Sequence, residues 1–92
     1  MNEQFIESQL KKAVESSGGF CWKLVCPGTT GVPDRICLMN SRSVFVELKA
    51  PGKQPRPIQL RRMNQLRQQG FTTLVVDSVD AIQEVLDALS AA

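Results

Sequence analysis

Two short segments of this 92-residue chain carry side chains that can do chemistry, Asp34 and Glu47-Leu48-Lys49. Residues 43–49 read Ser-Val-Phe-Val-Glu-Leu-Lys, which predicts a β-strand. Side chains alternate across a strand, so Glu47 and Lys49 share one face while Leu48 points to the core. An isolated Glu-x-Lys of this kind is more simply interpreted as a solvated strand end.

Asp34 changes that interpretation, although by itself it is an ordinary turn residue after proline. It opens a predicted strand over 35–39, and a turn at 40–42 would pair this strand with 43–49 as a hairpin. Asp34 then lies near Glu47, and two neighbouring carboxylates repel unless a divalent cation lies between them. Mg²⁺ prefers such oxygen ligands and lowers the pKa of water that can attack a phosphodiester. Lys49 would orient that water or stabilise charge on the phosphate.

A third acidic ligand is expected from the predicted helix over 3–17. Its apolar stripe is centred between Ile6 and Leu10, at about 100° per residue. Glu7 lies at the edge of this stripe, half-buried against the rim of the sheet. Glu3 stays as the alternative, because an acid at a helix start also interacts favourably with the helix dipole.

Gln59 is a polar residue on the inward stripe of a second predicted helix, over 57–69. Met63 and Leu66 define that stripe. A half-buried glutamine needs hydrogen-bond partners. It can bond a phosphate or a metal-bound water, or solvent can satisfy it in the first turn.

The remaining elements follow from periodicity and turn residues. Residues 20–26 predict a strand, 71–76 another, and Ser78 is expected to cap a last helix. The expected fold is α/β, a restriction-endonuclease-like core with a mixed sheet flanked by helices, as one domain over 1–92. Its element order is helix-strand-strand-strand-helix-strand-helix.

Composition excludes several chemistries. The chain has no His and no Tyr, which excludes Ser-His-Asp and Cys-His catalysis and phosphotyrosyl intermediates. Its three cysteines lack CxxC spacing and are interpreted as small core residues. No apolar run is long enough for a membrane span, and no signal peptide is recognisable, so we expect a cytoplasmic protein.

Charge is distributed unevenly, although the net charge is only +2. No acidic residue lies between Leu48 and Val76. A basic segment of this kind favours a polyanion such as DNA, or is a solvated helix face. The candidate DNA-binding residues in it are Lys53, Arg56, Arg61, Arg62 and Arg67.

Gly31-Val32-Pro33-Asp34, the stretch Val-Phe-Val-Glu-Leu-Lys-Ala-Pro-Gly-Lys over 44–53, and Gln59 together resemble the PD-(D/E)xK nucleases. Within that superfamily they are similar to the VRR-NUC family, the virus-type replication and repair nuclease domain. The resemblance covers nearly the whole chain and suggests a stand-alone member of phage type, which would act in the cytoplasm of a bacterial host.

The resemblance implies a role for each matched residue. Asp34 and Glu47 would be metal ligands, with the Leu48 carbonyl as a further one and Lys49 as the catalytic lysine. Glu7 and Gln59 would match the helix-borne acid and glutamine of the family. The resemblance also implies Mg²⁺ or Mn²⁺ as cofactor and a homodimer that cleaves branched DNA such as four-way junctions. A restriction-like, flap or single-strand nuclease, or an inert DNA-binding module, are the alternatives.

Overall fold

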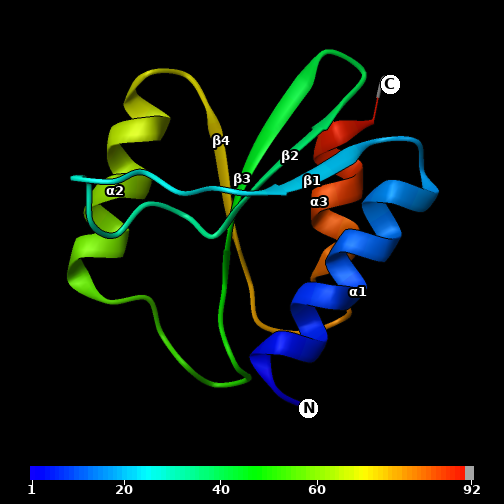
Figure 1. The fold of residues 1–92 in the computed structure, drawn as a ribbon, viewed down its shortest axis with the longest axis horizontal. Coiled ribbons are helices and arrows are strands. Elements are labelled where there is room, and N and C mark those ends of the chain that lie inside the picture. The colour runs from blue at the N-terminus through cyan, green and yellow to red at the C-terminus, as the bar shows by residue number, and fades with distance from the viewer. Residues whose placement is uncertain (91–92) are drawn as a thin grey trace.

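The computed structural model describes residues 1–90 and has the predicted α/β fold (Figure 1). The predicted order of helices and strands is confirmed. The predicted domain over 1–92 includes two residues, 91 and 92, outside the described part. The elements are α1 (Glu3–Ser16), β1 (Phe20–Lys23), β2 (Arg35–Met39), β3 (Arg42–Leu48), α2 (Pro57–Gln68), β4 (Thr72–Val76) and α3 (Ile82–Leu89).

The four strands form one open mixed sheet in the order β1-β2-β3-β4. Strands β1, β2 and β3 pair antiparallel, and β4 runs parallel to β3. The hairpin between β2 and β3 turns at Asn40 and Ser41, which both have positive φ, at 55° and 60°. Two such residues match the right-handed twist of paired strands, and they fix the register that the site needs.

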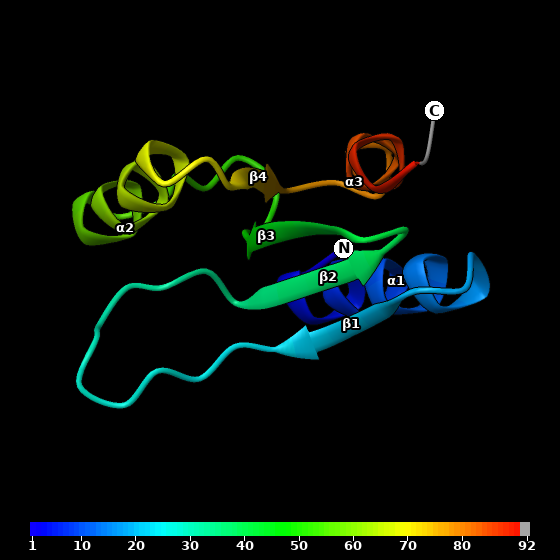
Figure 2. The ribbon, with the colours of Figure 1, turned by 90° about the horizontal axis from the view of Figure 1, so that it is seen from above.

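Helices cover the two faces of the sheet unequally. Figure 2 shows α1 and α3 on one side and α2 on the other, towards β4. The core lies under α1 and α3, where residues at helical spacing meet the alternate side chains of β3. Its fully buried members include Ile6, Leu10, Val44, Val46 and Leu48. The opposite face of β3 carries Phe45 and Glu47 and is buried as well.

Two boundaries differ from the prediction by more than one residue. The strand expected over 20–26 ends at Lys23, because the chain leaves the sheet for the long loop that leads to Asp34. The last helix begins at Ile82, with Ala81 as its N-cap, so Ser78 is not the cap. Ser78 Oγ accepts a hydrogen bond from the Ala81 N–H at 3.1 Å and closes a separate turn before the helix. A serine supports either structure locally.

Candidate active site

Asp34 and Glu47 face each other across neighbouring strands. The register pairs Arg35 with Val46, so one further step sets Asp34 opposite Glu47. The Leu48 N–H donates a hydrogen bond of 2.8 Å to Asp34 Oδ2. This bond fixes the Asp34 carboxylate against the end of β3 and places the Leu48 backbone beside the two acids. The structure therefore brings together the carboxylates that the sequence predicted to be neighbours.

Glu47 is buried although it is acidic, with 1% of its surface exposed. Its Oε2 lies 3.5 Å from Lys49 Nζ, while its Oε1 has no hydrogen-bond partner in the described residues. Burial and then the negative charge of Asp34 raise the pKa of Glu47 to about 7, against the opposing effect of Lys49. Ionisation of the Glu47 carboxyl group is therefore less favourable than ionisation of a solvent-exposed glutamate.

These residues fit a hard divalent cation. An unpartnered buried carboxylate oxygen beside a second carboxylate is the donor set that Mg²⁺ or Mn²⁺ takes. A cation there would satisfy Glu47 Oε1 and reduce the repulsion from Asp34. Across residues 1–90, three or more acidic or cysteine side chains do not gather at one point suitable for a metal ion.

Glu7 does not join the two acids. Its carboxylate accepts a hydrogen bond from Arg35 Nε at 2.8 Å, and Arg35 Nη1 donates to the Cys21 carbonyl at 3.0 Å. The charge of Glu3 does reach Glu47, where it raises the pKa further. The structure thus gives Glu7 a partner that ties α1 to β1 and β2, and its role as a ligand stays a prediction.

Arg35 is a residue that the sequence reasoning missed. It is 8% exposed and shares the core face of β2 with Cys37. The signal was available, because alternation from Cys37 places Arg35 on the buried face, where an arginine needs an anionic partner.

Gln59 is buried, as its place on the stripe predicts, but its side chain has a local partner. Gln59 Oε1 accepts a hydrogen bond from the Arg56 N–H at 2.8 Å. A glutamine at the third helical position that bonds back to the N-cap backbone satisfies a free donor at the helix start. Gln59 therefore stabilises the start of α2, which follows the loop after Lys49.

The basic residues of the middle segment divide into two groups. Arg62 donates to the Thr30 carbonyl at 2.8 Å and to Gln65 Oε1 at 3.0 Å, and Arg67 donates to the Thr73 carbonyl at 3.2 Å. These two arginines hold α2 to its neighbours. The exposed side chains of Lys53, Arg56 and Arg61 make no such bond within the described part of the chain.

Known proteins resemble this chain along nearly its full length. A curated protein named "Putative nuclease p44", from Acyrthosiphon pisum secondary endosymbiont phage 1, is 42% identical over 91 residues, covering 98% of this chain and 97% of that protein. A solved structure described as "VRR_NUC domain" superposes with a TM-score of 0.86 at 28% identity, over 96% of this chain and 97% of the other. The sequence matches no protein-family model.

A second solved structure, "VRR_NUC domain protein", has a TM-score of 0.77 at 15% identity, over 97% of this chain and 88% of its own, and shows the shared fold. The fold, the paired carboxylates and these relatives define a nuclease of restriction-endonuclease-like type. The chain belongs to the VRR-NUC domain family, which confirms the family resemblance of its motifs. Among residues 1–90, no helix is both long and apolar enough to cross a membrane.

Proposed function

We propose that this protein hydrolyses phosphodiester bonds in DNA with Mg²⁺ or Mn²⁺, held by Asp34 and Glu47. The observation that carries the proposal is the buried Glu47 carboxylate, whose Oε1 has no hydrogen-bond partner among residues 1–90 although Asp34 and Lys49 lie beside it. Keeping such a group buried is costly for a structural protein. A buried carboxylate with an unpaired oxygen is useful in a site that must bind a cation strongly.

The chain's own residues have separable tasks. Asp34 and Glu47 present carboxylate oxygens to the cation, with the Leu48 carbonyl as a further candidate ligand. A bound Mg²⁺ or Mn²⁺ neutralises charge on the phosphate and makes water a better nucleophile near neutral pH. The Lys49 ammonium, held by Glu47 at 3.5 Å, stabilises the negative charge that grows on the phosphate oxygens as water attacks phosphorus.

The proposed substrate is branched DNA, and the proposed enzyme is a homodimer. A four-way junction presents two symmetry-related scissile strands, and a two-fold dimer presents two sites to match them. One protomer measures only 32 × 31 × 21 Å, which is small for such a substrate. The exposed Lys53, Arg56 and Arg61 would bind phosphates without reading sequence.

The test compares cleavage of a labelled four-way junction, a flap, a single strand and a linear duplex, with Mg²⁺, Mn²⁺ or EDTA. Glu47→Ala and Lys49→Ala are each expected to cut about 100-fold more slowly or worse. Glu84→Ala and Lys11→Ala remove the same residue types from exposed helix positions and should cut like wild type.

Each outcome of this comparison has a meaning. Wild-type protein that is inert with both metals, or site variants that cut normally, would contradict the proposed enzyme. Binding of DNA without cleavage would instead indicate an inert DNA-binding module. Equal cleavage of every substrate, or preference for flaps or single strands, would contradict the junction preference while leaving the nuclease intact.

A further inference from the structure

The side of the sheet that carries Asp34 and Glu47 also carries exposed aromatic rings. Side chains alternate along β1, β2 and β3, so every second residue points away from α1 and α3. We call the apolar residues that share this side with the two acids the site face, and they are Phe20, Trp22, Ile36, Leu38 and Phe45. Within residues 1–90, α2 is the helix on this side, and it packs against β4 and leaves β1 open.

Phe20 and Trp22 form a ridge on the edge strand β1. They are 57% and 55% exposed, although both rings are large and apolar. Their ring centroids lie 5.4 Å apart, with the planes tilted by 37°. Aromatic rings paired in this way hold one another in place, and exposed apolar side chains that lie together mark an interaction surface.

The ridge lies close to the candidate metal site. Trp22 pairs directly with Ile36, and Asp34 lies two positions before Ile36 on the same side of its strand. Diagonal neighbours of this kind are about 7–8 Å apart. The Leu24 N–H donates to the Asp34 carbonyl at 2.9 Å, so the chain after β1 still runs beside Asp34. A molecule that binds the ridge therefore also lies beside the carboxylates.

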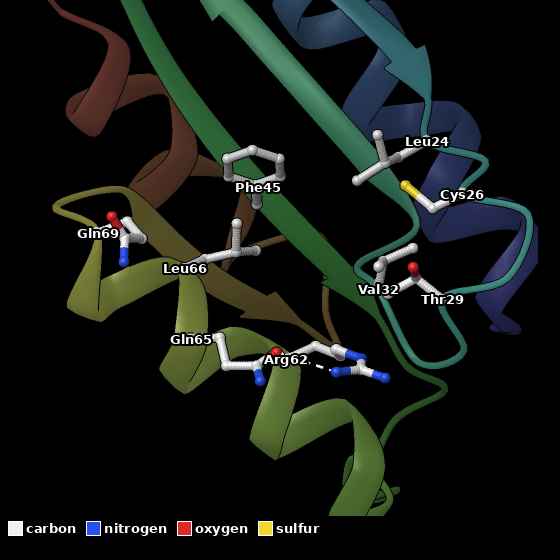
Figure 3. A pocket seen from close by; sticks show the side chains of 9 residues that line it. All are labelled: Leu24, Cys26, Thr29, Val32, Phe45, Arg62, Gln65, Leu66 and Gln69. Carbon is white, nitrogen blue, oxygen red and sulfur yellow. Dashed lines mark hydrogen bonds between the residues drawn. The ribbon is translucent and has the colours of Figure 1, made fainter.

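A hollow of about 300 Å³ extends the site face away from the ridge, between α2 and the loop that follows β1 (Figure 3). Phe45 lies at its centre, and Leu66 and Val32 line its walls, together with the amides of Gln65 and Gln69. Apolar walls with a few polar groups suit a flat heterocycle, which has apolar faces and polar edges. The volume is at the lower end of the range for small-molecule pockets, which suits a single ring system.

The surroundings favour nucleobases over a protein as the occupant of this face. A protein bound there would cover Asp34 and Glu47, which the proposed function needs open to DNA. Arg61 is exposed on α2, the helix that forms one wall of the hollow. It supplies a cation for the phosphate that accompanies each base.

Bases must be unpaired to reach these rings. A duplex presents its phosphates and groove edges to a protein, while the faces of its bases are covered by neighbouring bases. An aromatic side chain stacks on a base that has left the helix, and it does so with little dependence on sequence. Aromatic side chains exposed on a sheet are a recurring platform for such bases.

We propose that the site face binds unpaired nucleobases of the DNA substrate, one stacked on the ridge of Phe20 and Trp22 and another in the hollow beside Phe45. The proposal rests on the proposed nuclease function and adds the substrate feature that the site selects. Phe20 and Trp22 are then positioning residues, which act through the stacked base to bring its phosphate to Asp34 and Glu47. DNA with unpaired bases should therefore bind more tightly than a continuous duplex.

The experiment titrates the full chain with three hairpin DNAs in EDTA, where binding is observed without cleavage. One hairpin is fully paired, one carries a short bulge of unpaired bases, and one carries the same bulge built from abasic nucleotides. The abasic bulge keeps the phosphates and removes the bases, so it separates stacking from charge. Trp22 is the single tryptophan of the chain, and its fluorescence should be quenched by the bulged hairpin far more than by the other two.

Substitutions in the ridge give a second measurement, by fluorescence anisotropy of the labelled hairpins. Trp22→Ala and Phe20→Ala should each weaken binding of the bulged hairpin about tenfold and leave the paired and abasic hairpins unaffected. The loss should be the same at every salt concentration, because stacking releases no counterions. Trp22→Phe retains a ring that can stack and should recover most of the affinity.

Phe5→Ala is the matched control. It removes a comparably exposed ring, at 47%, from α1 on the other side of the sheet, and should bind all three hairpins like wild type. Circular dichroism confirms that each variant is folded. Two independent ridge variants keep the test decisive if one of them fails to fold.

Equal binding of the three hairpins, an unquenched Trp22, or an equal loss in Phe5→Ala would overturn the proposal. A Trp22 emission that shifts as the free protein is diluted would overturn it too, because another copy of the chain would then cover the site face. Cleavage is measured separately, in Mg²⁺. Binding of unpaired bases without cleavage would contradict only the proposed function, and cleavage without quenching of Trp22 would contradict only the role of the site face.

Discussion

Among the acidic side chains, Glu47 has the surroundings that best fit a cation-binding carboxylate. The residue is 1% exposed. One carboxylate oxygen lies 3.5 Å from Lys49 Nζ, and the other has no hydrogen-bond partner in the part of the chain that the structure describes. Its pKa of about 7 lies above the ordinary value of 4.5, chiefly because of burial and then because of Asp34. Between pH 4.5 and 7, the Glu47 carboxyl group therefore retains a proton in the native protein that it has already lost in the unfolded chain.

This difference predicts how stability depends on pH in the metal-free protein. Between pH 4.5 and 7 the native state binds more protons than the unfolded state, so the free energy of unfolding falls as pH rises. The free energy of unfolding of Glu47→Gln does not fall in this way, because glutamine does not ionise. It should gain stability relative to wild type by up to about 3 kcal/mol between pH 4.5 and 8.

Urea unfolding at several pH values, in EDTA, checks this prediction. The exposed Glu84→Gln is the matched control and should follow wild type at every pH. Saturating Mg²⁺ should stabilise wild type more than Glu47→Gln at pH 8, since a bound ligand stabilises the native state. A difference between Glu47→Gln and wild type that is independent of pH would contradict the assigned pKa.

At the scale of elements, the site depends on how the Gly-Val-Pro-Asp segment meets the start of α2. Gly31 has φ +88°, and a Cβ placed on it would lie 2.8 Å from Ile58 Cγ1 and 3.1 Å from the Ile58 carbonyl oxygen. The first turn of α2 thus packs directly on the backbone that leads to Asp34. Gln59, by capping the same turn, stabilises that contact.

Gly31→Ala is expected to destabilise the fold more than a left-handed backbone alone would. Gly28→Ala is the matched control, because Gly28 has φ +84° with nothing within 4 Å of its Cβ position. The control should cost about 1–2 kcal/mol for an L-residue in the left-handed region. Gly31→Ala should cost at least about 1 kcal/mol more, since the Ile58 backbone must move.

Thermal or urea unfolding of the two variants measures this difference, and metal binding by calorimetry shows whether the site moves with it. Equal destabilisation of Gly31→Ala and Gly28→Ala would mean that the contact with Ile58 is not important. A weaker affinity for Mg²⁺ in Gly31→Ala, but not in Gly28→Ala, would connect the contact to the position of Asp34.

On the scale of the whole molecule, the basic segment is expected to determine how strongly DNA binds. Arg61 is exposed on α2 and makes no internal bond within residues 1–90, whereas Arg62 and Arg67 donate hydrogen bonds to the Thr30 and Thr73 carbonyls. Arg61→Ala should weaken binding evenly across sequences and reduce the salt slope by about 1. Arg42→Ala, an exposed arginine at the start of β3, is the control.

Fluorescence anisotropy with labelled junction DNA in EDTA, at several salt concentrations, provides the measurement. Arg42→Ala should bind like wild type, because it lies at the opposite end of β3 from Glu47. An unchanged slope for Arg61→Ala, or an equal loss for Arg42→Ala, would show that DNA binds through another surface.

Short-range periodicity is enough to predict the element order and the faces of the strands. Alternation over 43–49 placed Glu47 and Lys49 on one face, and the turn predicted at 40–42 brought Asp34 near Glu47. The structure shortens that turn to Asn40 and Ser41 and sets Asp34 opposite Glu47. The first turn of α3 was misplaced because Ser78 caps a turn as readily as a helix. These relations connect residues that are close to each other in the sequence.

The burial of each site residue and its contacts follow from tertiary packing. Glu47 is almost fully buried on the inner strand β3, and Glu7 meets Arg35, 28 positions away. Arg62 is engaged with Thr30 across a similar separation, although the sequence grouped it with the exposed arginines. Such contacts depend on the packing of whole elements, and no local pattern specifies them.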